Sequence, residues 1–160
     1  MSNILRFVQI FALGTWVGSI FYFSAAVAPA AFRVLQSQDQ AGLLVEFTFR
    51  RLHTLGVVTG VVFLFASAIL AMSASGSGKS LLLPAIGVAV MLILTIISQH
   101  VVIRRMMNLR RQMVSVAGTP TDNPLRVEFD RLHQWSVRIE GAVLLIGFGA
   151  LFLTVRSKPM

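Results

Sequence analysis

Long stretches without a charged side chain constrain the fold of this chain more than any other feature. No Asp, Glu, Lys or Arg occurs between Arg6 and Arg33, between Arg51 and Lys79, or between Lys79 and Arg104. A helix needs about 20 apolar residues to cross the hydrocarbon core of a bilayer, and each of these stretches is longer than that. Charged residues make up only 12% of the chain, against roughly 25% in a soluble domain. The sequence therefore predicts an integral membrane protein.

The pattern predicts an all-α fold, a membrane four-helix bundle in which residues 1–160 form one transmembrane domain. The four spans are expected at about residues 4–28, 52–72, 81–102 and 135–155. Pro29 is expected to kink or end the first helix, because proline cannot donate a helical hydrogen bond. Asp39 is the expected N-cap of the second helix, and Asn123 followed by Pro124 predicts the start of the last one. A short Ser/Gly connection is expected at residues 73–80.

A short motif occurs twice, just before the second and the fourth span. Residues 49–53 and 129–133 both have the pattern Phe-x-Arg-Leu-His. The repeat predicts two similar helical hairpins related by a pseudo-two-fold axis, with His53 and His133 in equivalent places. Gly-x-x-x-Gly patterns, which let membrane helices approach closely, occur at residues 14–18 and 56–60.

The basic residues are unevenly divided between the two sides of such a bundle. One side holds Arg6, Lys79, Arg156 and Lys158, and the other holds Arg33, Arg50, Arg51, Arg104, Arg105, Arg110, Arg111, Arg126, Arg131 and Arg138. Cytoplasmic loops carry the excess of Lys and Arg, so both termini are expected outside the cytoplasm, with the chain in a bacterial inner membrane. The net charge of +8 is then explained by topology and contact with the lipid bilayer, not by nucleic acid.

The last span carries ionisable residues at membrane depth. Only residues 141–155 are free of charge there, so a full span places Arg138 and Glu140 below the interface. An intramembrane ionisable group is by default a functional candidate. Glu140 is expected to point into the bundle and meet a partner, with His53, His133, Arg33 and Arg51 as candidates. Gln99, near the end of the third span, is a further polar residue at this depth. The alternative to a functional role is that Gln99 only forms a hydrogen bond between helices.

All three histidines fall at one expected membrane level. If their faces turn inward, His53, His100, His133 and Glu140 form a candidate metal site, or His53 and His133 ligate a haem iron. Histidine also suits the membrane interface for its own sake, because its body is apolar and its tip polar. The chain has no cysteine, which excludes disulfides and thiolate metal sites. It also has no Ser-His-acid, paired-carboxylate or nucleotide-binding motif, which favours a protein without catalytic activity.

Two motifs resemble a known family. Trp16-Val17-Gly18, followed by Ala28-Pro29-Ala30-Ala31-Phe32-Arg33, resembles the first span of the bacterial domain-of-unknown-function family 4149, which has transmembrane protein 205 as a eukaryotic relative. Phe129-x-x-Leu132-His133-x-x-Ser136 resembles the last span of that family. The resemblance implies a four-helix membrane protein of undefined biochemistry, and the eukaryotic member is associated with tolerance of metal-containing drugs. A looser likeness exists to copper-resistance proteins of the CopD type and to the haem protein HemJ, although this chain lacks a histidine in its first span.

Three hypotheses about function follow. The first is a transport, tolerance or accessory factor without catalysis. The second is a haem- or metal-binding membrane redox protein, and the third is a structural subunit of a larger membrane complex. Membrane protein partners or a homo-oligomer are compatible with each of them.

Overall fold

The computed structural model describes residues 2–73 and 79–157. Its helices are α1 (Ser2–Tyr22), α2 (Ala28–Val34), α3 (Gln38–Ser73), α4 (Lys79–Ile97), α5 (Arg104–Gln112) and α6 (Pro124–Arg156). A π-helical turn, η1 (Phe23–Val27), joins α1 to α2, and a second one, η2 (Ser98–Ile103), joins α4 to α5. These segments form four long rods, so the predicted all-α, four-helix bundle is confirmed. The Ser/Gly connection expected at 73–80 falls largely outside the described residues.

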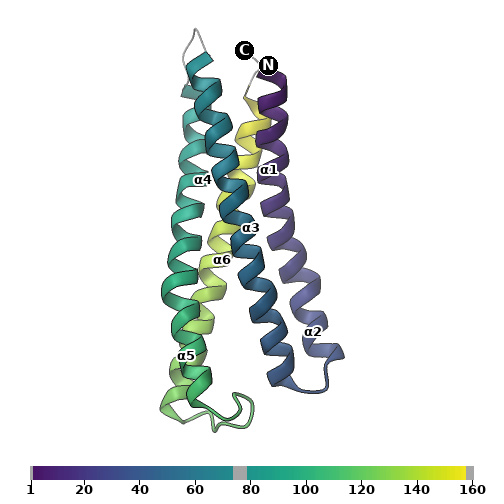
Figure 1. Ribbon diagram of the computed structural model, residues 1–160, viewed down its shortest axis with the longest axis vertical. Helices are drawn as coiled ribbons and strands as arrows, with labels where there is room; N and C mark the ends of the chain where they lie inside the picture. Colours follow the sequence, from purple (N-terminus) through teal and green to yellow (C-terminus); the bar gives the residue numbers. More distant parts are fainter. Residues whose placement is uncertain (1, 74–78, 158–160) are drawn as a thin grey trace.

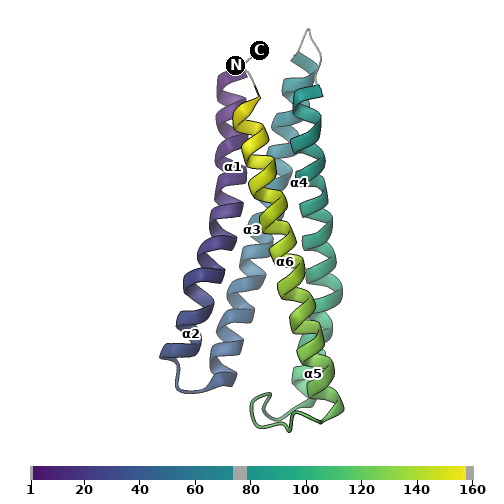
Figure 2. The same cartoon turned by 180° about the vertical axis from the view of Figure 1, so that it is seen from behind.

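The four rods alternate in direction and pack as a ring (Figure 1). Helix α3 packs against α1 and α4, and α6 packs against the same two helices from the other side. Helices α3 and α6 therefore face each other diagonally across the bundle, as the view from behind also indicates (Figure 2). The first residues of α1 and the last residues of α6 lie together at one end, which we call the terminal end. The opposite end carries α2, α5 and the first turns of α3 and α6, and we call it the basic end.

Many large apolar side chains lie on the outside of the rods. Large hydrophobic side chains such as Phe7, Phe65, Leu145 and Phe152 are more than 60% exposed, while Trp16 inside the bundle is 1% exposed. Water would not stabilise such a surface, but lipid chains do. Rods of 32 to 36 residues are roughly 50 Å long, longer than the hydrocarbon core of about 30 Å. The chain is an integral membrane protein whose helices extend beyond the bilayer.

The expectations for local helix boundaries have different outcomes. The regular α-helix of the first rod does stop before Pro29, at Tyr22, but the rod continues through the π-helical turn η1 to Val34. The ring stands at the beginning of α2, where a missing N–H is tolerated. Asp39 does not cap α3, which already begins at Gln38. Its carboxylate instead accepts hydrogen bonds from Ser115 and from the backbone N–H of Val116. Asn123 does cap α6, accepting from the N–H of Leu125 at 2.9 Å, as predicted.

The two Gly-x-x-x-Gly patterns differ in what they face. A Cβ atom on Gly56 would lie 2.3 Å from Nε1 of Trp16, and one on Gly60 would lie 2.8 Å from side-chain atoms of Leu92 and Trp16. A Cβ on Gly14 or Gly18 would meet nothing within 4 Å. Only the α3 pattern therefore serves close packing within this bundle, by making room for the indole of Trp16.

Polar contacts close the bundle at both ends. At the terminal end, the Arg6 guanidinium donates to the backbone oxygen of Thr154 and to Ser157. At the basic end, Arg110 pairs with Glu46 at 3.2 Å, so α5 is held against α3. Asp39 binds the segment after α5 in the same region, outside the apolar part of α3. The Ser115 hydroxyl, followed by the Val116 and Ala117 amides, holds the pKa of Asp39 below its usual value.

Candidate functional site

An ionisable pair crosses the centre of the bundle. Nε2 of His53, on α3, lies 3.2 Å from Oε2 of Glu140, on α6. The two side chains are 1% and 9% exposed. Since α3 and α6 are diagonal neighbours, the pair spans the bundle axis instead of lying along one helix–helix seam. The expectation that Glu140 points into the bundle and contacts a histidine is confirmed.

The surroundings of the pair are set by helical spacing. Phe49, one turn before His53, lies against the imidazole with ring centroids 4.3 Å apart, and Phe23 of η1 packs on Phe49 at 5.4 Å. Ser136, one turn before Glu140, is also buried. Glu140 is the last charged residue before the apolar run of α6, so the pair lies at the beginning of the apolar part of the bundle, on the side of the basic end.

Further hydrogen-bonding groups at this level lack partners. Nδ1 of His53 is buried without a hydrogen bond among the described residues, and so are the hydroxyls of Thr95 and Ser98 on the facing helix. Leu92 lies against Gly60, which places Thr95 and Ser98 near the levels of Gly56 and His53, because α3 and α4 are antiparallel. Buried polar groups are normally satisfied. The centre of the bundle therefore has unused hydrogen-bonding capacity beside an ionisable pair.

The structure does not bring the other candidate residues to this pair. His133 and His100 are exposed, whereas His53 is buried. His133 lies two turns before Glu140, roughly 10 Å along α6, so it is not level with His53. Within the described ranges, no group of three His, Asp or Glu side chains is placed to hold a metal ion. Arg138 is exposed and lies over the ring of Trp135, 5.5 Å from its centroid. Gln99 and His100 line a cleft on the side of α5, described below.

The two copies of the Phe-x-Arg-Leu-His motif consequently have different surroundings. Phe49 packs against the main core around Trp16, and His53 lies against Phe49. Phe129 instead joins a separate small cluster at the basic end, with Leu109, Met113 and Val116. The residue of α6 level with His53 is Glu140, not His133. The expected equivalence of His53 and His133 is therefore not found, because α6, which carries the second copy of the motif, is shifted along the bundle axis relative to α3.

A second buried polar contact was not anticipated from the sequence. Nε2 of Gln9, on α1, donates to Oγ of Ser67, on α3, at 2.7 Å. Gln9 is 1% exposed and Ser67 is 6% exposed, and neither carries a charge. A polar residue within the first apolar run was the available signal. The contact links α1 to α3 on the terminal side of Trp16. It is a buried interhelical hydrogen bond like that of the His53–Glu140 pair, but it contains no ionisable group.

Four apolar rods around a buried His–Glu pair define a polytopic helical membrane protein with a polar centre. The chain belongs to the family described as a domain of unknown function, DUF4149, whose model matches residues 11–115, well over half of the chain. The match includes α3 with His53 and ends before α6 with Glu140. No curated protein matches the chain. No solved structure matches it either.

Proposed function

We propose that this chain is a non-catalytic transport or tolerance factor of a bacterial inner membrane, with the His53–Glu140 pair as its working element. The observation that carries the proposal is an ionisable pair buried across the bundle axis. Carboxylates and imidazoles at membrane depth are costly, and they typically belong to proton or ion pathways. Both members can hold a proton, and separating them exposes a carboxylate that binds a cation.

The surrounding groups support an exchangeable site over a purely structural one. An entirely structural pair would be expected to satisfy both imidazole nitrogens, yet Nδ1 of His53 has no partner among the described residues. The hydroxyls of Thr95 and Ser98 are similarly placed on the facing helix. These groups are available to a proton, a water molecule or a small ligand that passes through the centre.

The proposal predicts the effect of Glu140→Gln on tolerance. Gln has nearly the same shape and can still hydrogen-bond His53, so the bundle should fold, but it cannot ionise. Cells that lack the chain are complemented with wild type or variant and grown on a panel of divalent metal salts and metal-containing drugs. Wild type should raise tolerance to at least one compound, and Glu140→Gln should lower it to the level of the empty vector.

Ser67→Ala is the matched control for this experiment. It removes the other buried interhelical hydrogen bond, between Gln9 and Ser67, without touching an ionisable group. The control should keep wild-type tolerance. Equal loss in both variants, at equal protein levels in the membrane, would mean that packing alone is responsible. A wild-type chain that changes growth on no compound would contradict the proposal as a whole.

The proposed orientation has its own test. The described arginines of the basic end gather around α5 and the loops beside it, which the positive-inside rule assigns to the cytoplasm. A reporter that is active only in the cytoplasm should therefore stay silent when fused to the C-terminus. The same reporter inserted between Ala117 and Gly118, in an exposed part of the connection between α5 and α6, should be active. The reverse pattern would overturn the orientation.

Haem or metal binding and membership of a larger complex are the competing functions. The exposed position of His133 gives no support to joint ligation of a haem by His53 and His133. An absorption spectrum and a metal analysis of the purified protein test this directly, because bound haem gives an intense Soret band. A stoichiometric partner that remains bound after mild solubilisation would favour the subunit role.

A further inference from the structure

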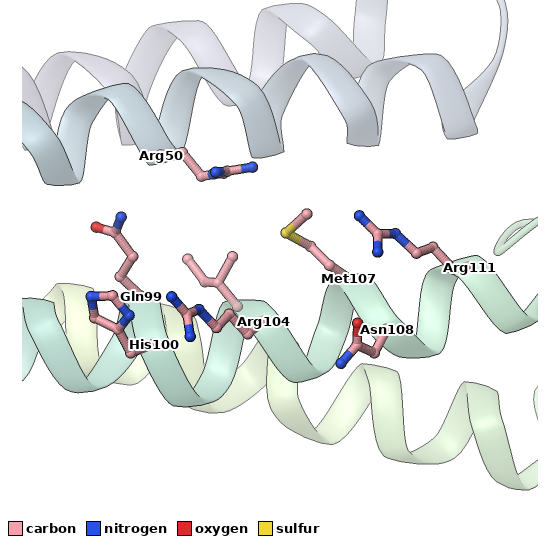
Figure 3. A pocket seen from close by; sticks show the side chains of 8 residues that line it. Arg50, Gln99, His100, Arg104, Met107, Asn108 and Arg111 are labelled. Atoms are coloured by element: carbon pink, nitrogen blue, oxygen red, sulfur yellow. The ribbon is translucent and has the colours of Figure 1, made fainter.

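A cleft of about 340 Å³ lies at the basic end, between α3 and the η2–α5 segment. Arg50 forms one wall, and Arg104 and Arg111 lie on the other (Figure 3). We propose that this cleft binds the phosphate headgroup of an anionic phospholipid from the leaflet at the basic end. The proposal is independent of the proposed function, because it involves neither His53 nor Glu140.

The first argument is the charge of the cleft. Three guanidinium groups line it and no carboxylate does. Two other arginines of α5 have acidic partners: Arg105 pairs with Glu128, and Arg110 pairs with Glu46. Arg50, Arg104 and Arg111 form no ion pair within the ranges that the structure describes. The charges of Arg105 and Arg110 are therefore balanced by glutamates, whereas the positive charges at the cleft are not balanced by an acidic residue.

The second argument is the kind of donor. A guanidinium presents a planar fork that matches two phosphate oxygens, and several forks around one anion fix its position. Gln99 and Asn108 add neutral amide donors to the same lining. Figure 3 shows Arg50 on the side of α3 that faces the helix carrying these groups. An anion held between the walls would be contacted from both sides.

The third argument concerns the floor and the rim, which favour a lipid over a soluble anion. Ile103 is buried at the cleft and Met107 is half-buried, so the lining is not uniformly polar. Just before the cleft, Ile97 and Val101 are 44% and 59% exposed on the lipid-facing part of the rod. The cleft therefore lies where α4 leaves the apolar layer and α5 becomes basic. A phospholipid presents a phosphate and acyl chains at this same boundary.

Neighbouring contacts give the cleft fixed limits. The Glu46–Arg110 pair joins α3 to α5 on the outer side, and the His53–Glu140 pair joins α3 to α6 on the inner side. Arg50 stands on α3 between the two, one turn from each. These two ion pairs fix the position of α3 relative to α5 and α6. The width of the cleft is therefore set before a ligand binds.

The test compares lipid and free phosphate on the purified full-length protein in a neutral detergent. Thermal unfolding is followed while phosphatidylglycerol, phosphatidylcholine or inorganic phosphate is titrated. Phosphatidylglycerol should raise the unfolding temperature saturably, and phosphatidylcholine should not. Inorganic phosphate should require a concentration at least a hundredfold higher, because it lacks the acyl chains. A comparable effect of inorganic phosphate would overturn the assignment to lipid.

Paired variants separate a site from general electrostatic attraction. Arg50→Gln with Arg104→Gln should weaken the phosphatidylglycerol effect at least tenfold. Arg33→Gln with Arg131→Gln removes the same charge from exposed positions outside the cleft and should leave the effect within twofold of wild type. All four side chains are exposed, so both proteins should fold, which circular dichroism checks. Equal weakening in the two variants, or none in the first, would refute the site.

Discussion

Replacing Gly56 by Ala should destabilise the bundle by about 1–3 kcal/mol, the usual cost of overpacking a full core. The added Cβ would lie 2.3 Å from Nε1 and 2.5 Å from Cε2 of Trp16. The indole cannot move aside easily, because Trp16 is 1% exposed and lies within the main core. The midpoint of unfolding by sodium dodecyl sulfate in mixed micelles measures the loss.

Gly18→Ala is the matched control for this variant. It adds the same methyl group to the same kind of motif, but a Cβ at Gly18 would meet nothing within 4 Å. Its midpoint should equal or slightly exceed that of wild type, because Ala favours a helix over Gly. In Gly56→Ala, a second change of Trp16→Phe should recover part of the loss by supplying a smaller ring. If the two Gly→Ala variants unfold alike, the contact between Trp16 and α3 is not as described.

The contrast between the two glycine motifs illustrates what the sequence can and cannot predict. Spacing alone places Gly14 with Gly18, and Gly56 with Gly60, on one helix face each. It does not say which face turns toward a neighbour, since that depends on how each helix is rotated about its axis. Trp16 lies between Gly14 and Gly18 in the chain, and it is Trp16 itself that turns inward, toward α3. The sequence therefore predicted the packing of α3 and not that of α1.

The general architecture was predictable because it depends on properties that act over whole segments. Uncharged runs longer than a bilayer crossing predicted three of the four rods, and the shorter uncharged run at residues 141–155 predicted the fourth. Local chemistry at Asn123 and Pro124 predicted the start of α6, and this is confirmed by the cap on Leu125. Asp39 misled the prediction because its carboxylate satisfies a distant loop, which no local pattern reveals.

The candidate site was only partly accessible from the sequence. The shortness of the uncharged part of α6 was enough to single out Glu140, and His53 was among its expected partners. The repeated Phe-x-Arg-Leu-His motif suggested that His133 would match His53, but the register between the parallel rods α3 and α6 is decided by loop length and side-chain packing. Likewise, ten arginines predicted an orientation without indicating that Arg50, Arg104 and Arg111 would share one cleft.

Removing one member of the His53–Glu140 pair should destabilise the protein far more than removing both. Glu140→Leu leaves Nε2 of His53 buried without its partner, and His53→Leu leaves the carboxylate of Glu140 buried without its own. An orphaned buried polar group costs about 1–3 kcal/mol, and an orphaned charge about 3–5 kcal/mol. The double variant replaces both by apolar groups and should lie close to wild type. Ser136→Ala, a buried change one turn away, should shift the midpoint of unfolding little.

The double variant also separates stability from function. If the pair works as proposed, the double variant will unfold near the wild-type midpoint and reach the membrane in normal amounts, yet confer no tolerance. A stable double variant that retains tolerance would show that the pair only holds α3 against α6, and the proposed function would fail. Destabilisation equal to the sum of the two single changes would mean that the residues do not interact, contrary to the 3.2 Å contact between them. Because both members are removed, neither result can be ascribed to an unpaired charge left in the bilayer.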